Sequence, residues 1–257
     1  MNEEMLYHIA IRPKDGCRYA ILPGDPGRVE KIAVYLEDAE PLAQNREFTS
    51  WKGKICGESV IVMSTGIGGP SAAIALEELA DAGLETAIRI GTCGGMQLDI
   101  IPGDLVIPTA AVRMDGTSKE YAPVEYPAAA DFSVVNALAE AAEKLGCRFH
   151  TGVIQSKDSF YGQHSPERMP IYYELENKWD AWKRLGVLAS EMETATLFTV
   201  GAVRKVRMGC VLHSLWNQER KSSGYSDKDV FDTDTAVRTA VEAMKIIIKK
   251  DRERNGE

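Results

Sequence analysis

Two arginines stand next to glycines at positions where a positive charge needs an explanation. Arg89 interrupts an apolar run at residues 87–90 and precedes glycine-rich sequence that contains Thr92. Burying an unpaired guanidinium is costly, and a bound anion would offset that cost because the guanidinium fork holds anion oxygens in pairs. Arg28 follows a second glycine-containing turn, which begins at Gly24 and opens a predicted helix whose backbone N–H groups also attract anions. These residues predict a phosphate site, while an internal salt bridge is the alternative explanation for Arg89.

Two carboxylates fall on the first turn of another predicted helix. Glu191 and Glu193 flank Met192 directly after an apolar run. Acidic residues at this place favour the helix dipole, which is a sufficient structural explanation. A carboxylate is also a good acceptor for the paired hydroxyls of a sugar, and methionine offers an adaptable apolar wall for the sugar ring. The motif therefore permits a sugar site without requiring one.

Two further loops contain residue types that bind ligands. Residues 64–71 form a glycine-rich turn between a predicted strand and a predicted helix, which matches dinucleotide-binding turns poorly. The turn either serves as a tight connection or brings backbone amides to an anion or a sugar. In residues 158–163, Phe160 could stack on a base, and Gln163 presents both a donor and an acceptor. Taken alone, that segment cannot be distinguished from a surface loop.

These loops need a scaffold that brings them together. Short apolar runs alternate with longer segments of helical period. The predicted strands are residues 19–22, 47–52, 59–63, 87–90, 105–108, 152–156, 186–189 and 209–215, and the predicted helices are 27–36, 71–82, 134–145, 173–184, 193–204 and 233–250. Such alternation predicts a single α/β domain over residues 1–257, with a mostly parallel sheet covered by helices. Ligands of such sheets bind where loops meet beyond the carboxyl ends of the strands.

Composition argues against several classes of protein. Hydrophobic residues make up 44% and charged residues 26%, which is typical of a globular protein. Acidic residues exceed basic ones by 38 to 30, and the net charge of −8 argues against nucleic acid as a partner. Neither a signal peptide nor an apolar run long enough to cross a bilayer is recognisable, so no membrane partner is expected. Five scattered cysteines predict reduced thiols in a cytoplasmic protein, and the spacing of the four histidines predicts no protein-built metal site.

The order and spacing of five short motifs resemble the nucleoside phosphorylases of the uridine and hexameric purine type. The motifs are Pro23-Gly24-Asp25-Pro26, Arg46-Glu47-Phe48, the glycine-rich stretch 64–71, Arg89-Ile90-Gly91-Thr92 and Glu191-Met192-Glu193. The resemblance runs from about residue 7 to about residue 249. Residues 160–163 and the later Arg168 are similar to the pyrimidine-recognising loop of the uridine enzymes. The family's fold implies one α/β domain around a barrel-like, mixed or mostly parallel sheet flanked by helices.

The resemblance implies a reaction in which uridine and phosphate give uracil and ribose 1-phosphate, reversibly, with phosphate as co-substrate and no cofactor or required metal. The implied phosphate ligands are Gly24, Arg28, Arg89 and Thr92, with Arg46 supplied by a neighbouring subunit. The implied nucleoside pocket comprises His8 of the neighbour, Thr92, Cys93, Gly94, Phe160, Gln163, Arg168, Glu191, Met192, Glu193, Leu215 and Trp216. The expected catalytic residues are Arg89, Gln163, Arg168 and Glu193. The family assembles as a homodimer that shares its sites, usually within a hexamer, and members can hold a monovalent cation at positions that match Glu47, Ile67 and Ser71.

Four alternatives stay open at this point. A phosphorylase for purines or for several nucleosides is disfavoured because residues 212–217, where purine members carry an aspartate that protonates the base, contain none. A hydrolytic nucleosidase of the same fold would have no use for the two phosphate-binding arginines. A non-catalytic nucleoside-binding protein would bind uridine without releasing uracil. The dinucleotide-dependent dehydrogenase suggested by residues 64–71 would carry a nicotinamide cofactor.

Overall fold

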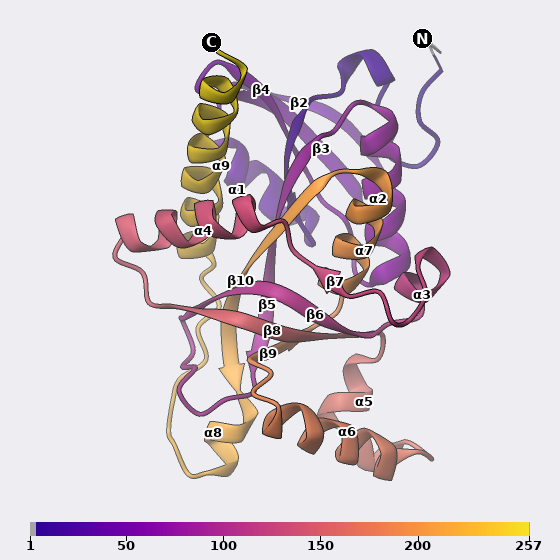
Figure 1. Cartoon of the computed structure of the whole chain (residues 1–257), viewed down its shortest axis with the longest axis vertical. Coiled ribbons are helices and arrows are strands. Elements are labelled where there is room, and N and C mark those ends of the chain that lie inside the picture. Colours follow the sequence, from indigo (N-terminus) through magenta and orange to yellow (C-terminus); the bar gives the residue numbers. More distant parts are fainter. Residues whose placement is uncertain (1–3, 257) are drawn as a thin grey trace.

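The computed structural model describes residues 4–256 (Figure 1). The strands of this part of the chain form one continuous sheet. In chain order they are β1 (Tyr19–Pro23), β2 (Glu37–Asn45), β3 (Phe48–Ile55), β4 (Glu58–Met63), β5 (Thr86–Gly95), β6 (Leu105–Met114), β7 (Ala128–Ala129), β8 (Phe149–Lys157), β9 (Ala189–Glu191) and β10 (Arg207–Asn217).

Helices form most of the connections between these strands. The longer ones are α2 (Gly69–Asp81), α4 (Phe132–Lys144), α6 (Tyr172–Arg184), α7 (Thr194–Arg204) and α9 (Asp234–Asn255). The short ones are α1 (Val29–Ala33), α3 (Thr117–Tyr121), α5 (Phe160–His164) and α8 (Gln218–Ser222), with 3-10 turns η1 (Pro13–Asp15), η2 (Pro26–Arg28) and η3 (Pro166–Arg168). Within residues 4–256, no helix combines the length and the apolar character that crossing a bilayer requires.

Part of the sheet closes on itself. β10 pairs with β6, β6 with β8, β8 with β9, β9 with β5, and β5 pairs back onto β10. From β5 the sheet continues through β1 and β4 to β3 and the edge strand β2. Parallel pairs join β1 to β4 and β5, β5 to β10, and β8 to β6 and β9. The pairs β2–β3, β3–β4, β5–β9, β6–β7 and β6–β10 are antiparallel. The predicted α/β fold with a mixed, barrel-like sheet flanked by helices is therefore confirmed.

Side chains of the central strands alternate between two hydrophobic cores. Along β1, Ala20 and Leu22 join the core that also contains residues of α2 and α7. Tyr19 and Ile21 join the core formed with α1, α4 and α9. This alternation follows from the two-residue period of a strand, and Figure 1 shows the two groups of helices on opposite sides of the sheet. The apolar runs of the sequence thus serve as strands covered on both faces.

The predicted strands and long helices are present, with shifted bounds, and two differences have clear physical reasons. β2 was not predicted because its sequence is polar and largely exposed; it is ordered by antiparallel backbone pairing with β3 at the edge of the sheet. β5 continues to Gly95, beyond the predicted end at residue 90, because its glycine-rich half stays in register with β10. The predicted helix at residues 27–36 is shorter, consisting of η2 and α1.

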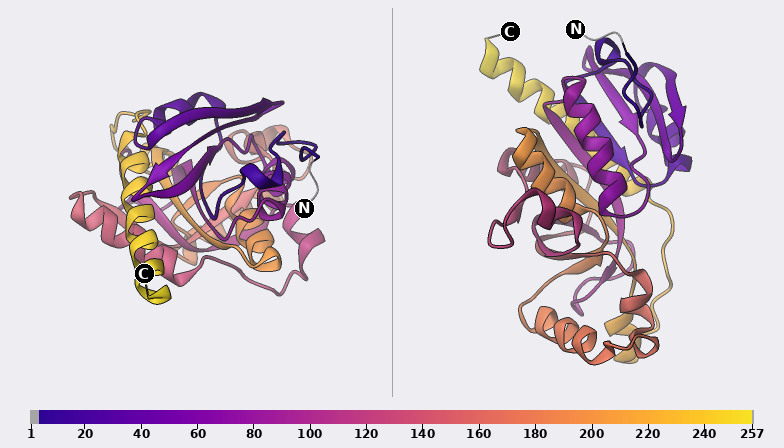
Figure 2. Two further views of the ribbon diagram at one scale, coloured as in Figure 1. Left: turned by 90° about the horizontal axis from the view of Figure 1, so that it is seen from above. Right: turned by 90° about the vertical axis from the view of Figure 1, so that its right-hand side faces the viewer.

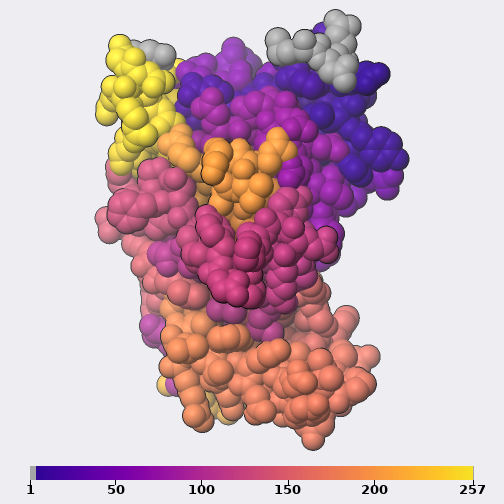
Figure 3. All heavy atoms as spheres, turned by 45° about the vertical axis from the view of Figure 1, so that its right-hand side comes forward, coloured from indigo at the N-terminus to yellow at the C-terminus, as the bar shows by residue number. Residues whose placement is uncertain are grey.

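Helices α5, α6 and α8 gather at the end of the molecule farthest from both termini (Figure 2). A hydrogen bond of 2.7 Å from Trp179 Nε1 on α6 to Glu219 Oε1 on α8 links two of them. In the space-filling view, the segment that contains α6 protrudes as the lower end of the molecule (Figure 3). α5 follows β8, α6 precedes β9 and α8 follows β10. The three helices therefore lie next to the loops at residues 158–163 and 191–193 that the sequence analysis identified.

Candidate active site

Seven chain segments line a cavity of about 610 Å³, and one of them is Glu47 in the turn between β2 and β3. The other six form or follow the carboxyl ends of β1, β4, β5, β8, β9 and β10, which is where ligands of α/β sheets bind. In that order, the segments contribute Gly24, Gly66, Thr92, Phe160, Glu193 and Trp216. The tertiary structure therefore brings together loops that are separated by nearly two hundred residues in the sequence.

Arg89 lies on β5 at the floor of this cavity and is only 3% exposed. Its Nε donates to Glu191 Oε2 at 3.2 Å, and its Nη2 pairs with the carboxylates of Glu191 and Glu193. Burial disfavours the charged guanidinium, but these carboxylates outweigh it, so the pKa of Arg89 is raised. The third nitrogen, Nη1, is buried without a hydrogen-bond partner within the described chain. The internal salt bridge that the sequence left open is thus real, and it still leaves one donor for a ligand.

Two glycines, Gly24 and Gly91, lie next to this guanidinium. A Cβ added at Gly91 would lie 2.8 Å from Arg89 Nη2, so any larger residue would displace the side chain. A Cβ added at Gly24 would lie 4.0 Å from Nη1, which places the Gly24 backbone beside the unpartnered donor. The position of Arg89 therefore requires a glycine at residue 91, whereas a Cβ at residue 24 would reach only ordinary van der Waals contact with Nη1.

A second cation faces the same part of the cavity. Arg28 lies at the end of η2, and its nearest carboxylate, Asp25 Oδ2, is 3.9 Å from Nε, which is too far for a hydrogen bond. Burial lowers the pKa of Arg28, Asp25 opposes this effect, and the charge of Arg89 lowers the pKa further. Two guanidinium groups that repel each other in a partly buried site are stabilised by an anion between them. This end of the cavity has the chemistry of an oxyanion site.

The two carboxylates of the 191–193 motif have different environments. Glu191 is committed to the fold, because its oxygens accept from Ser156 Oγ at 2.5 Å and from the backbone N–H groups of Glu193 and Thr194 at 3.0 Å. Glu193 makes fewer contacts: Oε1 accepts from Gly68 N at 2.6 Å and Oε2 pairs with Arg89. Burial and the charge of Glu191 raise the pKa of Glu193, although Arg89 acts in the opposite direction. Glu193 is therefore the carboxylate better placed to accept from a ligand hydroxyl.

Aromatic rings line another part of the cavity. The rings of Phe160 and His164 lie 4.3 Å apart, and the His164 and Trp216 rings lie 5.6 Å apart. Pairing between β5 and β10 is interrupted between Ser214 and Trp216, and such bulges redirect side chains beside binding sites. Burial lowers the pKa of His164, and Lys157 lowers it further, so the imidazole is biased toward its neutral form. Flat apolar surfaces of this kind suit a heterocyclic base.

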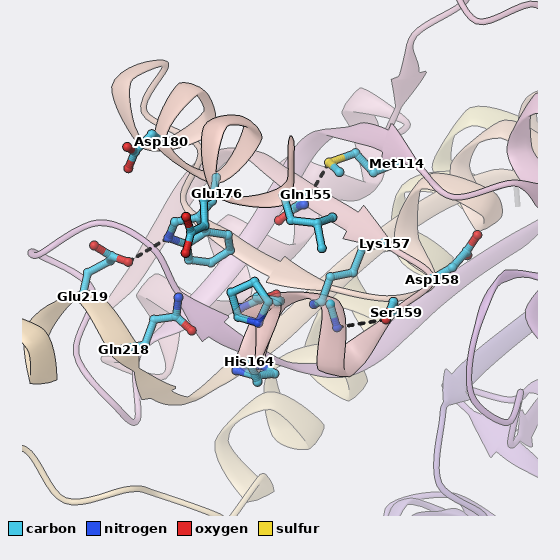
Figure 4. A pocket seen from close by; sticks show the side chains of 15 residues that line it. Met114, Gln155, Lys157, Asp158, Ser159, His164, Glu176, Asp180, Gln218 and Glu219 are labelled. Carbon is cyan, nitrogen blue, oxygen red and sulfur yellow. Dashed lines mark hydrogen bonds between the residues drawn. The ribbon is translucent and has the colours of Figure 1, made fainter. Parts of the chain in front are cut away.

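A second cavity of about 620 Å³ adjoins the first, and Lys157 and His164 line both. Figure 4 shows these two side chains next to each other among the residues that line the second cavity. Gln163 belongs to this second cavity, and its Oε1 accepts from Ser190 Oγ at 2.7 Å. Gln155 adds an amide oxygen that is buried without a partner in the described residues. Amide groups thus converge next to the aromatic part of the first cavity.

The sequence did not identify Lys157, the last residue of β8. Its side chain is buried, and its Nζ donates to Ser190 Oγ at 2.8 Å. Burial lowers the pKa of Lys157 to about 8 even though Glu191, Glu193 and Cys93 favour its charged form. A charged residue at the end of an apolar strand was the signal that drew attention to Arg89. Lys157 carries this signal only weakly, because the polar residues Gln155 and Ser156 separate it from the apolar pair at residues 153–154.

Most residues expected at the site line the first cavity: Gly24, Arg28, Arg89, Thr92, Cys93, Gly94, Phe160, Glu191, Met192, Glu193, Leu215 and Trp216. Three others do not line either cavity. Arg168 is exposed, with its guanidinium 5.6 Å from the centre of the Tyr161 ring. Arg46 is exposed, and His8 Nδ1 lies 2.6 Å from Glu78 Oε1 on α2. Within one chain, the structure therefore does not bring Arg168, Arg46 or His8 to the expected site.

The residues expected near a monovalent cation lie around the turn that precedes α2. Ser71 Oγ lies 2.7 Å from Glu47 Oε1 and 2.6 Å from the backbone oxygen of Thr65. The hydrogen bond from Ser71 Oγ to the Glu47 carboxylate lowers the pKa of Glu47. Glu47 and Ile67 also line the first cavity. Cation binding by these residues stays a prediction.

The fold and this site together define a class of protein, an α/β enzyme with an oxyanion site, an adjacent carboxylate and an aromatic subsite. Residues 18–250 match the model of the phosphorylase superfamily, and the chain belongs to that family. It is 53% identical to the uridine phosphorylase of Treponema pallidum over 95% of each chain, and 41% identical to that of Escherichia coli over 98% of this chain and 99% of the relative. It is also 42% identical to the guanosine phosphorylase of Halorubrum lacusprofundi over 79% of this chain and 80% of the relative. The family resemblance of the sequence motifs is confirmed.

Proposed function

We propose that the protein is an enzyme that catalyses the reversible phosphorolysis of uridine to uracil and ribose 1-phosphate. Inorganic phosphate is the co-substrate, and no cofactor is needed. The observation that carries the proposal is the buried, unpartnered Nη1 of Arg89 beside Arg28 and Gly24, in a cavity whose other end is aromatic. The similarity to uridine phosphorylases over nearly the whole chain supports uridine as the nucleoside.

The proposed mechanism starts with capture of phosphate by Arg28 and Arg89. Holding this weak nucleophile in line with the anomeric carbon removes much of the entropic cost of the encounter. As the C1′–N1 bond breaks, its electron pair leaves with the base, and a phosphate oxygen forms the new bond to C1′. The phosphate and the Glu193 carboxylate stabilise the positive charge that develops on the ribose. The base becomes an anion between the aromatic side chains.

A purine substrate is the second candidate, because one relative of similar identity is a guanosine phosphorylase. Against it stands the sequence of β10, where residues 212–217 include no carboxylate that could protonate a purine. The side chain of Asn217 in this segment is occupied by the fold: its Nδ2 donates to the backbone oxygens of Gln97 and Ile100. Uridine therefore fits the site better than a purine nucleoside.

A panel of nucleosides tests both candidates. Uridine, thymidine, inosine, guanosine and adenosine are incubated with the purified protein, with and without phosphate, and the released base is quantified. We expect rapid phosphate-dependent release of uracil and slow or no release of the purine bases. Faster cleavage of guanosine would establish the second candidate. Cleavage without phosphate would identify a hydrolase, and binding without cleavage would contradict an enzymatic role.

We also propose that the whole chain acts as one domain and that two copies share their active sites, because His8 and Arg46 lie outside the cavity of their own chain. The Arg28→Ala and Arg46→Ala variants are made separately, then dissociated and reassembled together. In a shared-site homodimer, each mixed dimer contains one site with both native arginines, so at limiting phosphate the mixture should regain about a quarter of the native activity. Activity equal to the mean of the two separate variants would contradict sharing. A hexamer and a cytoplasmic location are further proposals, the latter supported by five free cysteines.

A further inference from the structure

Lys157 is a buried cation without a matching carboxylate. Its side chain is 7% exposed, and its hydrogen bond within the described residues goes to a hydroxyl, Ser190 Oγ. Arg89, which is equally buried, forms ion pairs with both Glu191 and Glu193. No ion pair to Lys157 occurs in residues 4–256. A lysine ammonium carries three donors, so Lys157 has donors to spare in the wall of a ligand cavity.

The position of Lys157 relates it to the base rather than to the phosphate. It lies where the two cavities meet, together with His164, whose ring contacts Phe160 and Trp216. Ser190, its hydrogen-bond partner, in turn donates to Gln163 Oε1. Lys157, Ser190 and Gln163 thus form one polar chain that leads from the first cavity into the second, which neither Arg28 nor Gly24 lines.

We propose that Lys157 Nζ donates to the departing base and balances the negative charge that the base acquires as the C1′–N1 bond breaks. This inference rests on the proposed phosphorolysis and names a catalytic residue for it. The electron pair of the broken bond moves onto the base, the phosphate oxygen bonds to C1′, and Lys157 keeps its proton throughout. A preorganised cation in a water-poor site is an effective stabiliser of such charge.

Among residues 4–256, no other side chain at this end of the cavity carries a matching positive charge. Arg168 is exposed over the ring of Tyr161 and lines neither cavity. Gln163 presents a neutral amide whose oxygen is already occupied by Ser190. His164 is biased toward the neutral form by burial and by Lys157 itself. Lys157 therefore supplies the charge that the pyrimidine-recognising loop was expected to supply through Arg168.

The charge of Lys157 depends on pH in a range that is convenient to measure. Burial lowers its pKa to about 8, while Glu191, Glu193 and Cys93 face it and favour the charged form. Burial and Lys157 also lower the pKa of His164, the other titratable group beside Lys157, so its imidazole is biased toward the neutral form. Because the ammonium is the active form, kcat/KM for uridine should fall as the pH rises through about 8.

The test compares Lys157→Met and Lys157→Arg with the native enzyme on uridine and on 5-fluorouridine, whose base is a more stable anion. Lys157→Met should lower kcat/KM for uridine about 100-fold. The loss for 5-fluorouridine should be at least about tenfold smaller, because the better leaving group needs less stabilisation. The KM for phosphate should stay within about threefold. Lys157→Arg should keep part of the activity and lose the fall near pH 8, because arginine stays protonated.

Thermal unfolding distinguishes this role from a structural one. Folding lowers the pKa of Lys157 to about 8, so the unfolded chain binds this proton more tightly than the folded one does. The free energy of unfolding of the native protein should therefore rise as the pH increases from about 8 toward the ordinary pKa of lysine. Lys157→Met should lack this rise and unfold at no lower temperature than the native enzyme at pH 7. Equal losses on both substrates together with a lower melting temperature would overturn the proposal, as would unchanged kinetics. A native protein that cleaves no nucleoside would instead overturn the proposed function, and with it this role of Lys157.

Discussion

Replacing Arg89 with methionine should lower the rate of phosphorolysis by about 100- to 1000-fold and destabilise the fold at the same time. The loss of activity follows because the buried guanidinium supplies the unpartnered donor for phosphate, and one such donor contributes about 2.7–4 kcal/mol to catalysis. The loss of stability follows because Glu191 and Glu193 would remain buried without their cation. Breaking a buried ion pair from one side costs about 3–5 kcal/mol. Steady-state kinetics with varied phosphate and thermal unfolding measure the two effects.

Arg28→Met is the matched control for this change. Arg28 lines the same cavity, but it is more exposed and its carboxylate neighbour is 3.9 Å away. Its replacement should therefore raise the KM for phosphate about 10- to 100-fold with little change in melting temperature. If Arg89→Met lost stability but kept its affinity for phosphate, Arg89 would be a purely structural residue. Direct titration with phosphate separates that outcome from misfolding.

Replacing Glu193 with glutamine should lower kcat/KM for uridine about 1000-fold. Glutamine preserves the size of the side chain and can still accept from Gly68 N, so the turn at residues 66–69 should persist. It removes the negative charge beside the ribose and offers a weaker acceptor to the sugar hydroxyls. The loss should be smaller for 2′-deoxyuridine, which lacks one of these hydroxyls in every variant. Losses below about tenfold, or equal losses on both nucleosides, would contradict the proposed contact.

The same residue predicts the acidic limb of the pH profile. Burial and the charge of Glu191 raise the pKa of Glu193 from its ordinary value, although Arg89 opposes the shift. Since the ionised form is the active one, kcat/KM should begin to fall at a higher pH than a solvent-exposed glutamate would cause. The stability of the fold depends on pH in the opposite direction to the activity. Because the pKa is raised, the folded protein holds this proton more tightly than the unfolded chain does. The stabilisation from Glu193 is therefore present at low pH and is lost as the pH rises through the raised pKa.

The sheet and the long helices could be predicted from the sequence because burial on both faces leaves a strong signal. Apolar runs such as the one at residues 59–63 appear as strands wherever helices cover both sides. The closure of the sheet was implied only by the family resemblance. It depends on the pairing of β5 with β10, whose residues are more than a hundred positions apart. The edge strand β2 left no signal, since backbone pairing rather than burial orders it.

Several loops of the site could be recognised from residue types alone. Arg89 was conspicuous because a charge inside an apolar strand requires a partner, and the structure supplies two carboxylates while leaving Nη1 for a ligand. The same reasoning does not single out Lys157, because the polar residues Gln155 and Ser156 precede it and only the fold shows that they are buried. The position of Arg168 could not be predicted in this way. Its distance from Gln163 along the chain does not determine the direction of its side chain at the end of η3.

The sequence by itself determined the kind of fold, most of the loops that line the cavity and the residue types available there for the proposed binding of phosphate and a sugar. Only the tertiary structure decided how those groups are used: Glu191 is consumed by hydrogen bonds within the fold, Glu193 keeps contact with the cavity, and Lys157 takes a position at the aromatic end. The reason is that charge and hydrogen-bonding capacity are properties of each residue. Which groups form hydrogen bonds and ion pairs with each other depends on distances, and these are set by the pairing of strands far apart in the chain.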